Sequence, residues 1–323
     1  MTDETEATPP GGISRLATRA RWLLAIVPLV GVLELVLHLK QIKGDIVPSA
    51  DWVSAREFIE ADLRPDDLIL FEPFWADPLG RLSFGDLASS KRVARSDERR
   101  FRRAYEVSLR GAHNAAIASW RELKTQRTGG ITVTLRENPA FTPVIDDLLD
   151  FVAIDRLAVS RIDGTAEQAC SFQRGSTHGG STVVPQGLLT PAEKFVCSGG
   201  HVGIAVLHDV HHRPRLCIFA TPMQGASIRM RFANVTFGTS VHGHSGIQWV
   251  DERTPADDKV SLSFSAFERP LGTHLHHVGA GWIGFEFPTP ELDGKRGELV
   301  VELAPSGHRQ FCFEATTRRE PSP

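Results

Sequence analysis

The 323-residue sequence predicts a single N-terminal transmembrane helix, a small α/β layered domain and a C-terminal β-sandwich of the jelly-roll type. Three observations predict this fold class: one long apolar run near the N-terminus, alternating helix-like and strand-like segments in the first half, and evenly spaced strand-like runs in the second half. The expected parts are a cytoplasmic tail at 1–21, a membrane helix at 22–39, an α/β domain at 45–152, a linker at 153–195 and a sandwich at 196–318.

The apolar run is WLLAIVPLVGVLELVLHL, residues 22–39. Its length is at the short end of the roughly 17–25 residues that cross a bilayer. Glu34 and His38 make its insertion into a membrane less favourable. A buried core helix is the alternative. Three arginines precede the run and two lysines follow it, which favours a cytoplasmic N-terminus, and no signal-peptide cleavage pattern follows. We therefore expect a single-pass cell-membrane protein whose bulk is extracytoplasmic, or periplasmic in a Gram-negative cell.

The first half of the sequence predicts helices and strands that alternate along the chain. Helical spacing of apolar residues occurs in DWVSAREFIEADL, whereas DLILFEP is a short apolar strand. AYEVSLRG alternates as a strand, residues 113–127 have the spacing of an amphipathic helix, and Gly129-Gly130 precede the strand ITVTLRE. This order indicates a mostly parallel α/β layer structure.

A family resemblance covers about residues 40–140. The apolar helix followed by DWVSAREFIEADLRPDDLILFEPFWADPLGRLSFGD resembles the chain after the last membrane helix of polyprenyl-phosphate-sugar glycosyltransferases. AYEVSLRG and GGITVTLREN are similar to later strands of that extracytoplasmic α/β domain. The family's acidic catalytic residue and lipid-sugar chamber belong to many membrane helices that have no counterpart in this sequence. The resemblance therefore implies an association with glycan machinery, including a membrane-embedded glycan-assembly partner, without transferase activity.

The second half is dominated by short strand-like runs with Gly and Pro turns, which predicts a sandwich. Near its end, a strand, a Gly-Trp pair, a strand, a short polar turn and the G-x-L-x-V-x-L strand GELVVEL resemble jelly-roll carbohydrate-binding modules. That resemblance implies a glycan or envelope polymer as partner. A net charge of −3 and a pI near 6.5 argue against a nucleic-acid partner.

The four cysteines lie in the second half, and no two of them form a C-x-x-C pair. An even number in an extracytoplasmic domain predicts two disulfides, with three possible connectivities. Cys217 and Cys312 each lie inside a strand-like run, so we expect the bonds Cys217–Cys312 and Cys170–Cys197. The alternative is four reduced, buried cysteines.

Sugar binding needs an aromatic face and a few planar polar groups. The candidates for ligand binding are Gln248, Trp249, Asp251, Glu252, Arg253 and Trp282. The alternative is that both tryptophans belong to the sandwich core, where their large area is buried.

The stretch VHGHSGIQWV, residues 241–250, raises a metal site as an alternative. His242 and His244 are two residues apart and share one face of a strand, and His276 follows a Pro-Leu-Gly motif, as in a degenerate cupin pattern. However, Gln248 stands where a glutamate ligand belongs. We therefore expect no cofactor and place these histidines at strand ends and turns, with a divalent metal as the alternative.

In the first half, Glu72 and Asp77 follow the carboxyl end of a predicted strand, where open α/β sheets bind ligands. A close carboxylate pair would serve acid–base catalysis. The alternative is that Asp77 caps the next turn and Glu72 is solvated. Taken together, the sequence predicts a membrane-anchored accessory or binding protein without its own transferase chemistry. A metal-dependent cupin-like enzyme or a carboxylate-based glycan hydrolase remains the alternative.

Overall fold

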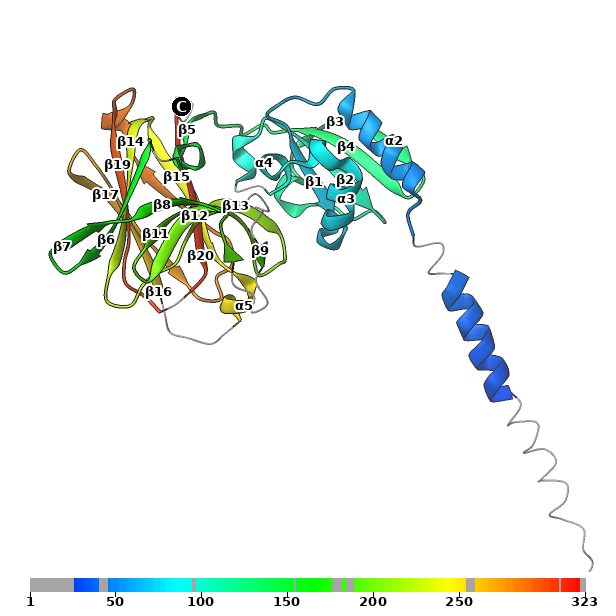
Figure 1. Ribbon diagram of the computed structural model, residues 1–323. Helices are drawn as coiled ribbons and strands as arrows, with labels where there is room; N and C mark the ends of the chain where they lie inside the picture. The colour runs from blue at the N-terminus through cyan, green and yellow to red at the C-terminus, as the bar shows by residue number, and fades with distance from the viewer. Residues whose placement is uncertain are drawn as a thin grey trace, which may run out of the picture. The chain divides into compact units, whose positions relative to one another are not determined.

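The computed structural model of the protein (Figure 1) describes residues 26–40, 46–94, 97–153, 155–175, 182–183, 189–253, 259–307 and 309–319. The chain divides into two compact units, Met1–Pro48 and Ser49–Pro323. Apart from residues 45–48, both the predicted α/β domain and the predicted sandwich therefore fall within the second unit.

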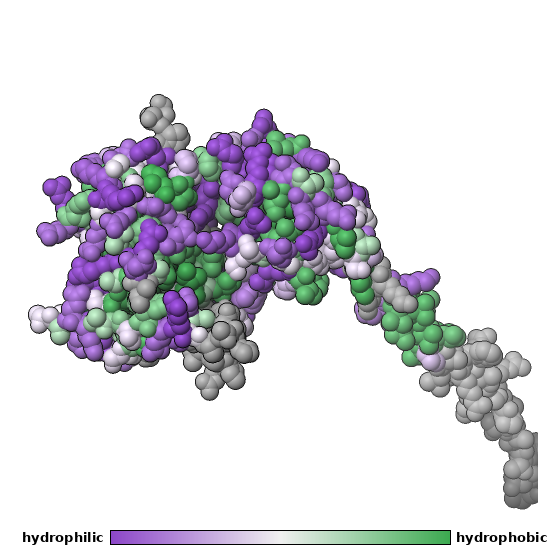
Figure 2. Space-filling model, turned by 45° about the horizontal axis from the view of Figure 1, so that its top comes forward, coloured by the Kyte–Doolittle hydropathy of each residue, from purple (hydrophilic) through white to green (hydrophobic). Residues whose placement is uncertain are grey.

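The first unit contains a helix at residues 26–40. Its large apolar side chains are exposed, and they form the continuous hydrophobic surface along this helix in Figure 2. Residues 22–25 of the predicted membrane helix lie outside the described residues. Within the described part of the chain, no helix is long and apolar enough to cross a membrane.

The second unit begins with α2 (Ser49–Glu60) and a four-stranded sheet. The strand order is β1-β2-β4-β3, with the bounds β1 (Leu68–Glu72), β2 (Arg103–Leu109), β3 (Arg121–Thr128) and β4 (Ile131–Glu137). Helix α2 buries Trp52 and Ile59, so the predicted apolar stripe is its packing face. The shorter helices are α3 (Asp77–Phe84) and α4 (Ser90–Val93), with 3-10 turns η1 (Phe74–Ala76), η2 (Gly85–Ala88), η3 (Glu98–Arg100), η4 (Ala115–Ile117) and η5 (Leu148–Phe151).

Two predictions for this region were wrong. Only β1 and β2 run parallel; β2, β4 and β3 are antiparallel neighbours. The predicted helix at 113–127 is instead the short turn η4 followed by β3. The turn at Gly129-Gly130, with Gly129 at φ 53°, brings Thr128 opposite Ile131 and closes a hairpin. Pairing with β4 therefore overrides the local helical spacing.

The rest of the unit is a sandwich of two antiparallel sheets. The eight-stranded sheet has the order β18-β15-β20-β13-β12-β11-β8, with β5 also paired to β20. Its strands are β5 (Val144–Asp147), β8 (Ser171–Arg174), β11 (Glu193–Cys197), β12 (Gly200–His208), β13 (Pro214–Ala220), β15 (Ser240–Ile247), β18 (Ile283–Pro288) and β20 (Phe311–Arg318). This confirms the predicted sandwich.

The second sheet has six strands in the order β17-β16-β19-β14-β6-β7. Its strands are β6 (Leu157–Asp163), β7 (Ala166–Ala169), β14 (Ser227–Thr236), β16 (Lys259–Ala266), β17 (Arg269–His277) and β19 (Arg296–Leu303). Outside the sheets are the pair β9 (Thr182–Val183) and β10 (Leu189–Thr190), the helical turn α5 (Trp249–Glu252) and the 3-10 turn η6 (Pro290–Leu292). The main core lies between the two sheets, and Phe232, Phe264 and Phe313 are among its fully buried side chains.

The segment 153–195, expected as a linker, differs from that expectation. It contributes β6 and β7 to the six-stranded sheet and β8 to the eight-stranded sheet, and β11 begins at Glu193. Much of β7 and β8 is exposed, so these strands carry little apolar alternation that sequence patterning could detect.

Both predicted disulfides are confirmed. Cys217 and Cys312 join the neighbouring strands β13 and β20, with Cα atoms 5.7 Å apart. Cys170 and Cys197 are bonded with Cα atoms 4.6 Å apart. The Cys217–Cys312 bond lies in a small apolar cluster with Leu207 and Phe219, separate from the main core. Because alternate residues of a strand face opposite sides, this cluster covers the outer face of the eight-stranded sheet.

The outer face of the eight-stranded sheet meets the first half of the same unit through buried polar contacts. Arg318 Nη2 lies 2.8 Å from Asp97 Oδ2, and both side chains are almost fully buried. Arg100 Nη2 lies 2.6 Å from Asp147 Oδ2. In addition, the Leu216 amide on β13 donates to the Ala94 carbonyl just after α4. These contacts fix the two halves together.

Candidate ligand-binding site

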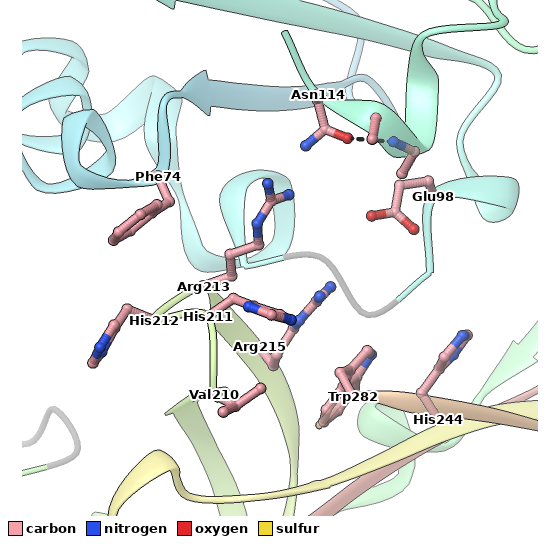
Figure 3. Close-up of a pocket in the computed structure, with 12 residues that line it drawn as sticks. Phe74, Glu98, Asn114, Val210, His211, His212, Arg213, Arg215, His244 and Trp282 are labelled. Carbon is pink, nitrogen blue, oxygen red and sulfur yellow. Dashed lines mark hydrogen bonds between the residues drawn. The ribbon is translucent and has the colours of Figure 1, made fainter. Parts of the chain in front are cut away.

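A pocket of about 640 Å³ lies where the first half of the unit meets the outer face of the eight-stranded sheet (Figure 3). We call it the Trp282 pocket. It is lined by Phe74, Glu98, Asn114, Ala115, Ala116, Val210, His211, His212, Arg213, Arg215, His244 and Trp282. Aromatic and cationic side chains therefore dominate its wall.

The turn between β12 and β13 supplies much of the cationic wall. Asp209 is buried, and its Oδ1 atom accepts hydrogen bonds from the amides of His211 and Arg213, both at 2.9 Å. Its Oδ2 atom accepts from Arg215 Nε, also at 2.9 Å. His212 completes the turn with φ 57°, a left-handed conformation that histidine adopts more readily than most residues. One buried carboxylate thus shapes the turn and orients an arginine.

Trp282 forms an aromatic surface of the pocket and packs on the apolar cluster around the Cys217–Cys312 bond. Its ring is nearly parallel to that of His244, at 4°, with centroids 6.1 Å apart. The Arg215 guanidinium carbon lies 5.3 Å from the indole centroid. A Cβ atom on Gly246 would come within 2.6 Å of Trp282 Cε3. The absence of a side chain at Gly246 therefore leaves space for the indole against β15.

The facing wall comes from the first half of the unit. Asn114 is fully buried, and its Nδ2 atom donates to Glu72 Oε1 at 2.5 Å. The same Glu72 oxygen lies 3.2 Å from Arg213 Nη2, so one buried carboxylate links the two walls. Phe74 is 43% exposed and its ring stacks on His212 with centroids 6.1 Å apart. The pocket is thus bounded by side chains that neighbouring groups hold in place.

His244 carries the clearest electrostatic signature in the pocket. Burial disfavours its charged form, but the hydrogen bond between Nδ1 and Glu314 Oε1, at 2.8 Å, and the negative charge of Glu314 outweigh burial. The charges of Asp97 and Glu98 act in the same direction, so the pKa of His244 is raised above its ordinary value. His244 therefore presents a cation to the pocket over a wider pH range than free histidine.

The six predicted ligand-binding residues are not brought together. Trp282 lines the pocket. Trp249 contacts the pocket residue His212, with the two ring centroids 5.0 Å apart. Arg253 stacks over Trp249 at 5.1 Å. Gln248 is buried and immediately precedes α5, which carries Trp249. The residues of this segment thus follow a helical turn rather than one strand face.

The two acidic residues predicted to bind a ligand accept hydrogen bonds from backbone amides instead. Asp251 Oδ2 accepts from the Gln310 amide at 2.8 Å. Glu252 is buried, and its carboxylate accepts from the amides of Gly279 and Gly281, the latter at 2.9 Å. Glu252 therefore supports the turn that carries Trp282.

The three histidines suggested as metal ligands do not converge. His242 and His244 share the outer face of β15, as their spacing predicts, whereas His276 is buried and bonds Ser245 Oγ at 2.8 Å. Ser245 points to the opposite face of β15 because side chains alternate along a strand. Each ring also has its own partner: Arg99 Nη2 is 2.9 Å from His242 Nδ1, and Glu252 Oε1 is 3.4 Å from His276 Nε2. Among the described residues, no group of three or more His, Cys, Asp or Glu side chains could hold a metal ion.

Glu72 and Asp77 both border a cavity of only about 10 Å³. Asp77 begins α3 and lies 2.9 Å from Arg81 Nε, one helical turn away. Glu72 is not solvated, contrary to the alternative interpretation, because Asn114 and Arg213 enclose it. Each carboxylate is thus held by an arginine.

Sequence reasoning did not single out Arg213, Arg215, Asn114 or Glu98. One available signal was Asp209 at the start of a turn with the sequence DVHHRPR, since Asp commonly bonds turn amides. A second was the alternation of Arg215 with Cys217, which predicts one shared face of β13. The contribution of Asn114 and Glu98 depends on packing between distant segments and has no local signal.

No protein-family model matches this chain, and no curated protein matches it. Among solved structures, the chain is similar to the K2 cleaved adhesin domain of Lys-gingipain, with 10% identity and a TM-score of 0.22 over 33% of this chain and 72% of that one. It is also similar to TmCBM61 in complex with β-1,4-galactotriose, with 10% identity and a TM-score of 0.24 over 38% of this chain and 87% of that one. A third similar structure contains carbohydrate-binding modules of the β-sandwich superfamily, with 10% identity and a TM-score of 0.29 over 61% of this chain and 71% of that one. At these scores the likenesses assign no family.

Proposed function

We propose that the protein is a membrane-anchored, extracytoplasmic accessory protein that binds a glycan in the Trp282 pocket and has no transferase chemistry of its own. The observation that carries this proposal is the Trp282 indole, which lines a pocket beside the planar polar groups of His244 and Arg215. A sugar ring needs an apolar surface for its C–H face and planar hydrogen-bonding groups for its hydroxyls. Buried partners hold these groups, which lowers the ordering cost of binding.

The extracytoplasmic location is supported by the two disulfides, because such bonds persist in oxidising compartments. Anchoring is supported by the apolar run at 22–39 and by the exposed apolar side chains of helix 26–40, which need an apolar environment. The glycosyltransferase-like segment at about 40–140 supports a membrane-embedded glycan-assembly partner.

A binding role is favoured over hydrolysis by the position of the candidate carboxylates. Glu72 and Asp77 are each within 3.2 Å of an arginine nitrogen, and neither is among the described residues that line the Trp282 pocket. A carboxylate-based hydrolase needs two carboxyl groups that face its substrate.

The direct test is binding of the full-length protein to a glycan array, followed by calorimetric titration of the best ligand. We expect Trp282→Ala to weaken that ligand at least about tenfold, since a lost aromatic contact costs about 1 kcal/mol or more. The matched control is Phe267→Ala. Phe267 is an exposed aromatic residue that lines a separate concavity on the six-stranded sheet. Circular dichroism and thermal unfolding establish that each variant is folded.

Normal affinity of a folded Trp282→Ala protein, or loss of affinity in Phe267→Ala alone, would place the glycan elsewhere and contradict the proposal. Absence of binding to every glycan would contradict the proposed function itself.

A further inference from the structure

An apolar stripe runs along one side of α3 and the turn before it. Ala76 and Asp77 both have right-handed helical dihedral angles, so η1 continues directly into α3. Trp75, Leu79 and Leu82 are therefore at helical positions i, i+4 and i+7, which share one face. Their exposed fractions are 45%, 51% and 82%. We call these three residues the α3 stripe.

A different set of residues packs α3 against the four-stranded sheet. Ala76, Gly80 and Phe84 are buried. A Cβ atom on Gly80 would clash with the Phe71 ring, so the helix lies directly on β1. Phe84 also packs edge-on against Phe71, with ring centroids 5.2 Å apart. The α3 stripe is thus a second apolar side of this helix, beyond the side that the fold buries.

Other exposed apolar residues do not form such a stripe. Among the described residues of the second unit, the remaining large ones are Val53, Phe74, Leu123, Ile204, Val250, Phe267 and Leu275. Phe74 belongs to the wall of the Trp282 pocket, where its ring stacks on His212. The others come from separate segments, and single apolar residues are ordinary on a protein surface. Apolar residues gathered on one helix face instead mark an interaction surface.

The length of the chain before α2 favours a membrane as the partner. Helix 26–40 exposes its large apolar side chains, and nine residue steps lead from Lys40 to Ser49 at the start of α2. At about 3.3–3.6 Å per step, they span at most about 30 Å. When the apolar run at 22–39 is in a bilayer, the start of the second unit is therefore held within about 30 Å of its surface.

The residue types of the α3 stripe suit the boundary between lipid and water. Tryptophan is enriched at this boundary because its ring is amphipathic, and an interfacial helix buries leucine side chains about 5–10 Å into it. The Arg110 guanidinium carbon lies 5.6 Å from the Trp75 ring centroid, so a cation accompanies the indole. A long arginine side chain can reach lipid headgroups while its neighbours contact acyl chains.

We propose that the α3 stripe inserts into the interfacial region of a phospholipid bilayer. The inference rests on the proposed membrane anchoring and goes beyond it, because an anchor alone leaves the second unit free to move on its tether. Insertion of the stripe gives that unit a second attachment to the membrane.

The test uses the full-length protein reconstituted into vesicles of phosphatidylcholine and phosphatidylglycerol. All four cysteines form disulfides, so Leu82→Cys supplies a single thiol for a polarity-sensitive fluorophore. We expect the emission of this label to be blue-shifted and to be quenched by brominated lipids. The matched control is Leu275→Cys on β17, which is also exposed. Its label should emit as in water and resist quenching by the same lipids.

Two further variants test whether the whole stripe acts together. Trp75→Ser/Leu79→Ser in the labelled Leu82→Cys protein should reverse the blue shift, because the remaining stripe has too little apolar surface to insert. Leu123→Ser in the same labelled protein is the control and should leave the shift intact. All three replaced side chains are exposed, so the core does not depend on them.

Flotation of the vesicles separates this inference from the proposed anchoring. Protein that does not float with the vesicles would contradict the anchoring and this inference together. Protein that floats while the Leu82 label emits as in water would leave the anchoring standing and overturn the inference. A blue shift that brominated lipids do not quench, or that disappears at one protein copy per vesicle, would indicate a second copy on the stripe and would also overturn it. Glycan-array binding is measured independently of these results.

Discussion

Two concavities formed by the described residues are each lined by a pair of arginines, and they differ in where the paired carboxylates lie. In the Trp282 pocket, Glu72 pairs with Arg213 and Asp209 pairs with Arg215, and both carboxylates are buried. In the second concavity, of about 490 Å³ on the six-stranded sheet, Arg229 and Arg231 share the exposed surface with their glutamate partners. Arginines and glutamates thus share the open face of the six-stranded sheet, whereas Glu72 and Asp209 are not among the described residues that line the Trp282 pocket.

The second concavity also lacks the rigid surroundings of the first. Arg229 contacts both Glu302 and Glu167, and the side chains of this network are between 26% and 41% exposed. Ion pairs this exposed contribute about 0–1 kcal/mol each, because water screens them and their side chains are mobile. The arginine-rich sheet face is therefore a solvated surface, and we propose that the interface between the two halves is the preorganised site.

The largest expected difference between the two regions concerns buried ion pairs. Arg318 has a fully buried side chain and pairs with Asp97, the neighbour of Glu98 in the pocket wall. Burial opposes ionisation of Asp97, yet the charge of Arg318 holds the pKa of Asp97 below its ordinary value. Arg318→Met would leave a buried carboxylate uncompensated, so we expect a loss of about 3–5 kcal/mol in the free energy of unfolding. Chemical denaturation measures this change.

The control for that prediction is Arg229→Met, which should cost no more than about 1 kcal/mol because its partners are exposed. Arg318→Met/Asp97→Asn should recover part of the loss, since the orphaned charge is gone. Equal effects of Arg318→Met and Arg229→Met would remove the distinction between the two regions.

A smaller effect should appear in the pH dependence of stability. The folded-state pKa of His244 is raised above its ordinary value of 6.5, with Glu314, Asp97 and Glu98 as the responsible charges. Protonated His244 therefore stabilises the fold fully below pH 6.5, and this contribution is lost as pH rises through the folded-state pKa. The unfolding free energy of wild type relative to His244→Gln should therefore fall as the pH rises from 6.5 through the folded-state pKa.

His277, which is exposed, offers the matched control for the pH experiment. The His277→Gln protein is measured over the same range, so that the effect of His244→Gln is compared with that of replacing an exposed histidine. A wild-type advantage over His244→Gln that grows with pH would contradict the raised pKa.

Much of the sandwich was predictable because its strands bury alternate residues. Runs such as KVSLSFSA in β16 and GELVVEL in β19 show this alternation directly. The disulfide pairing followed from the placement of Cys217 and Cys312 within strands. The shared face of His242 and His244 followed from their spacing. His276 lies on β17 in the other sheet and contacts Ser245 from the core side of β15, and this depends on how the two sheets pack together.

The pocket was much less predictable. Asn114 comes from a segment that has the spacing of a helix and forms a 3-10 turn, and Glu98 reaches the pocket through contacts such as Arg318–Asp97. Trp282 was identified as a candidate, but the other ligand-binding residues were predicted in the segment Gln248–Arg253, which precedes β16 and β17. The residues that surround it come instead from the β12–β13 turn, from β15 and from the first half, because tertiary packing and not sequence proximity builds the site.

The most direct test of the central claim is an indole N–H NMR titration of the full-length, ¹⁵N-labelled protein with the glycan that binds best. The six tryptophans give separate probes, and Trp282→Phe assigns the key signal. Ligand binding in the pocket should shift the Trp282 signal most, while Trp52 and Trp120, which are buried in the first half, stay unchanged. A saturating glycan that leaves the Trp282 signal in place would contradict a binding site at this pocket.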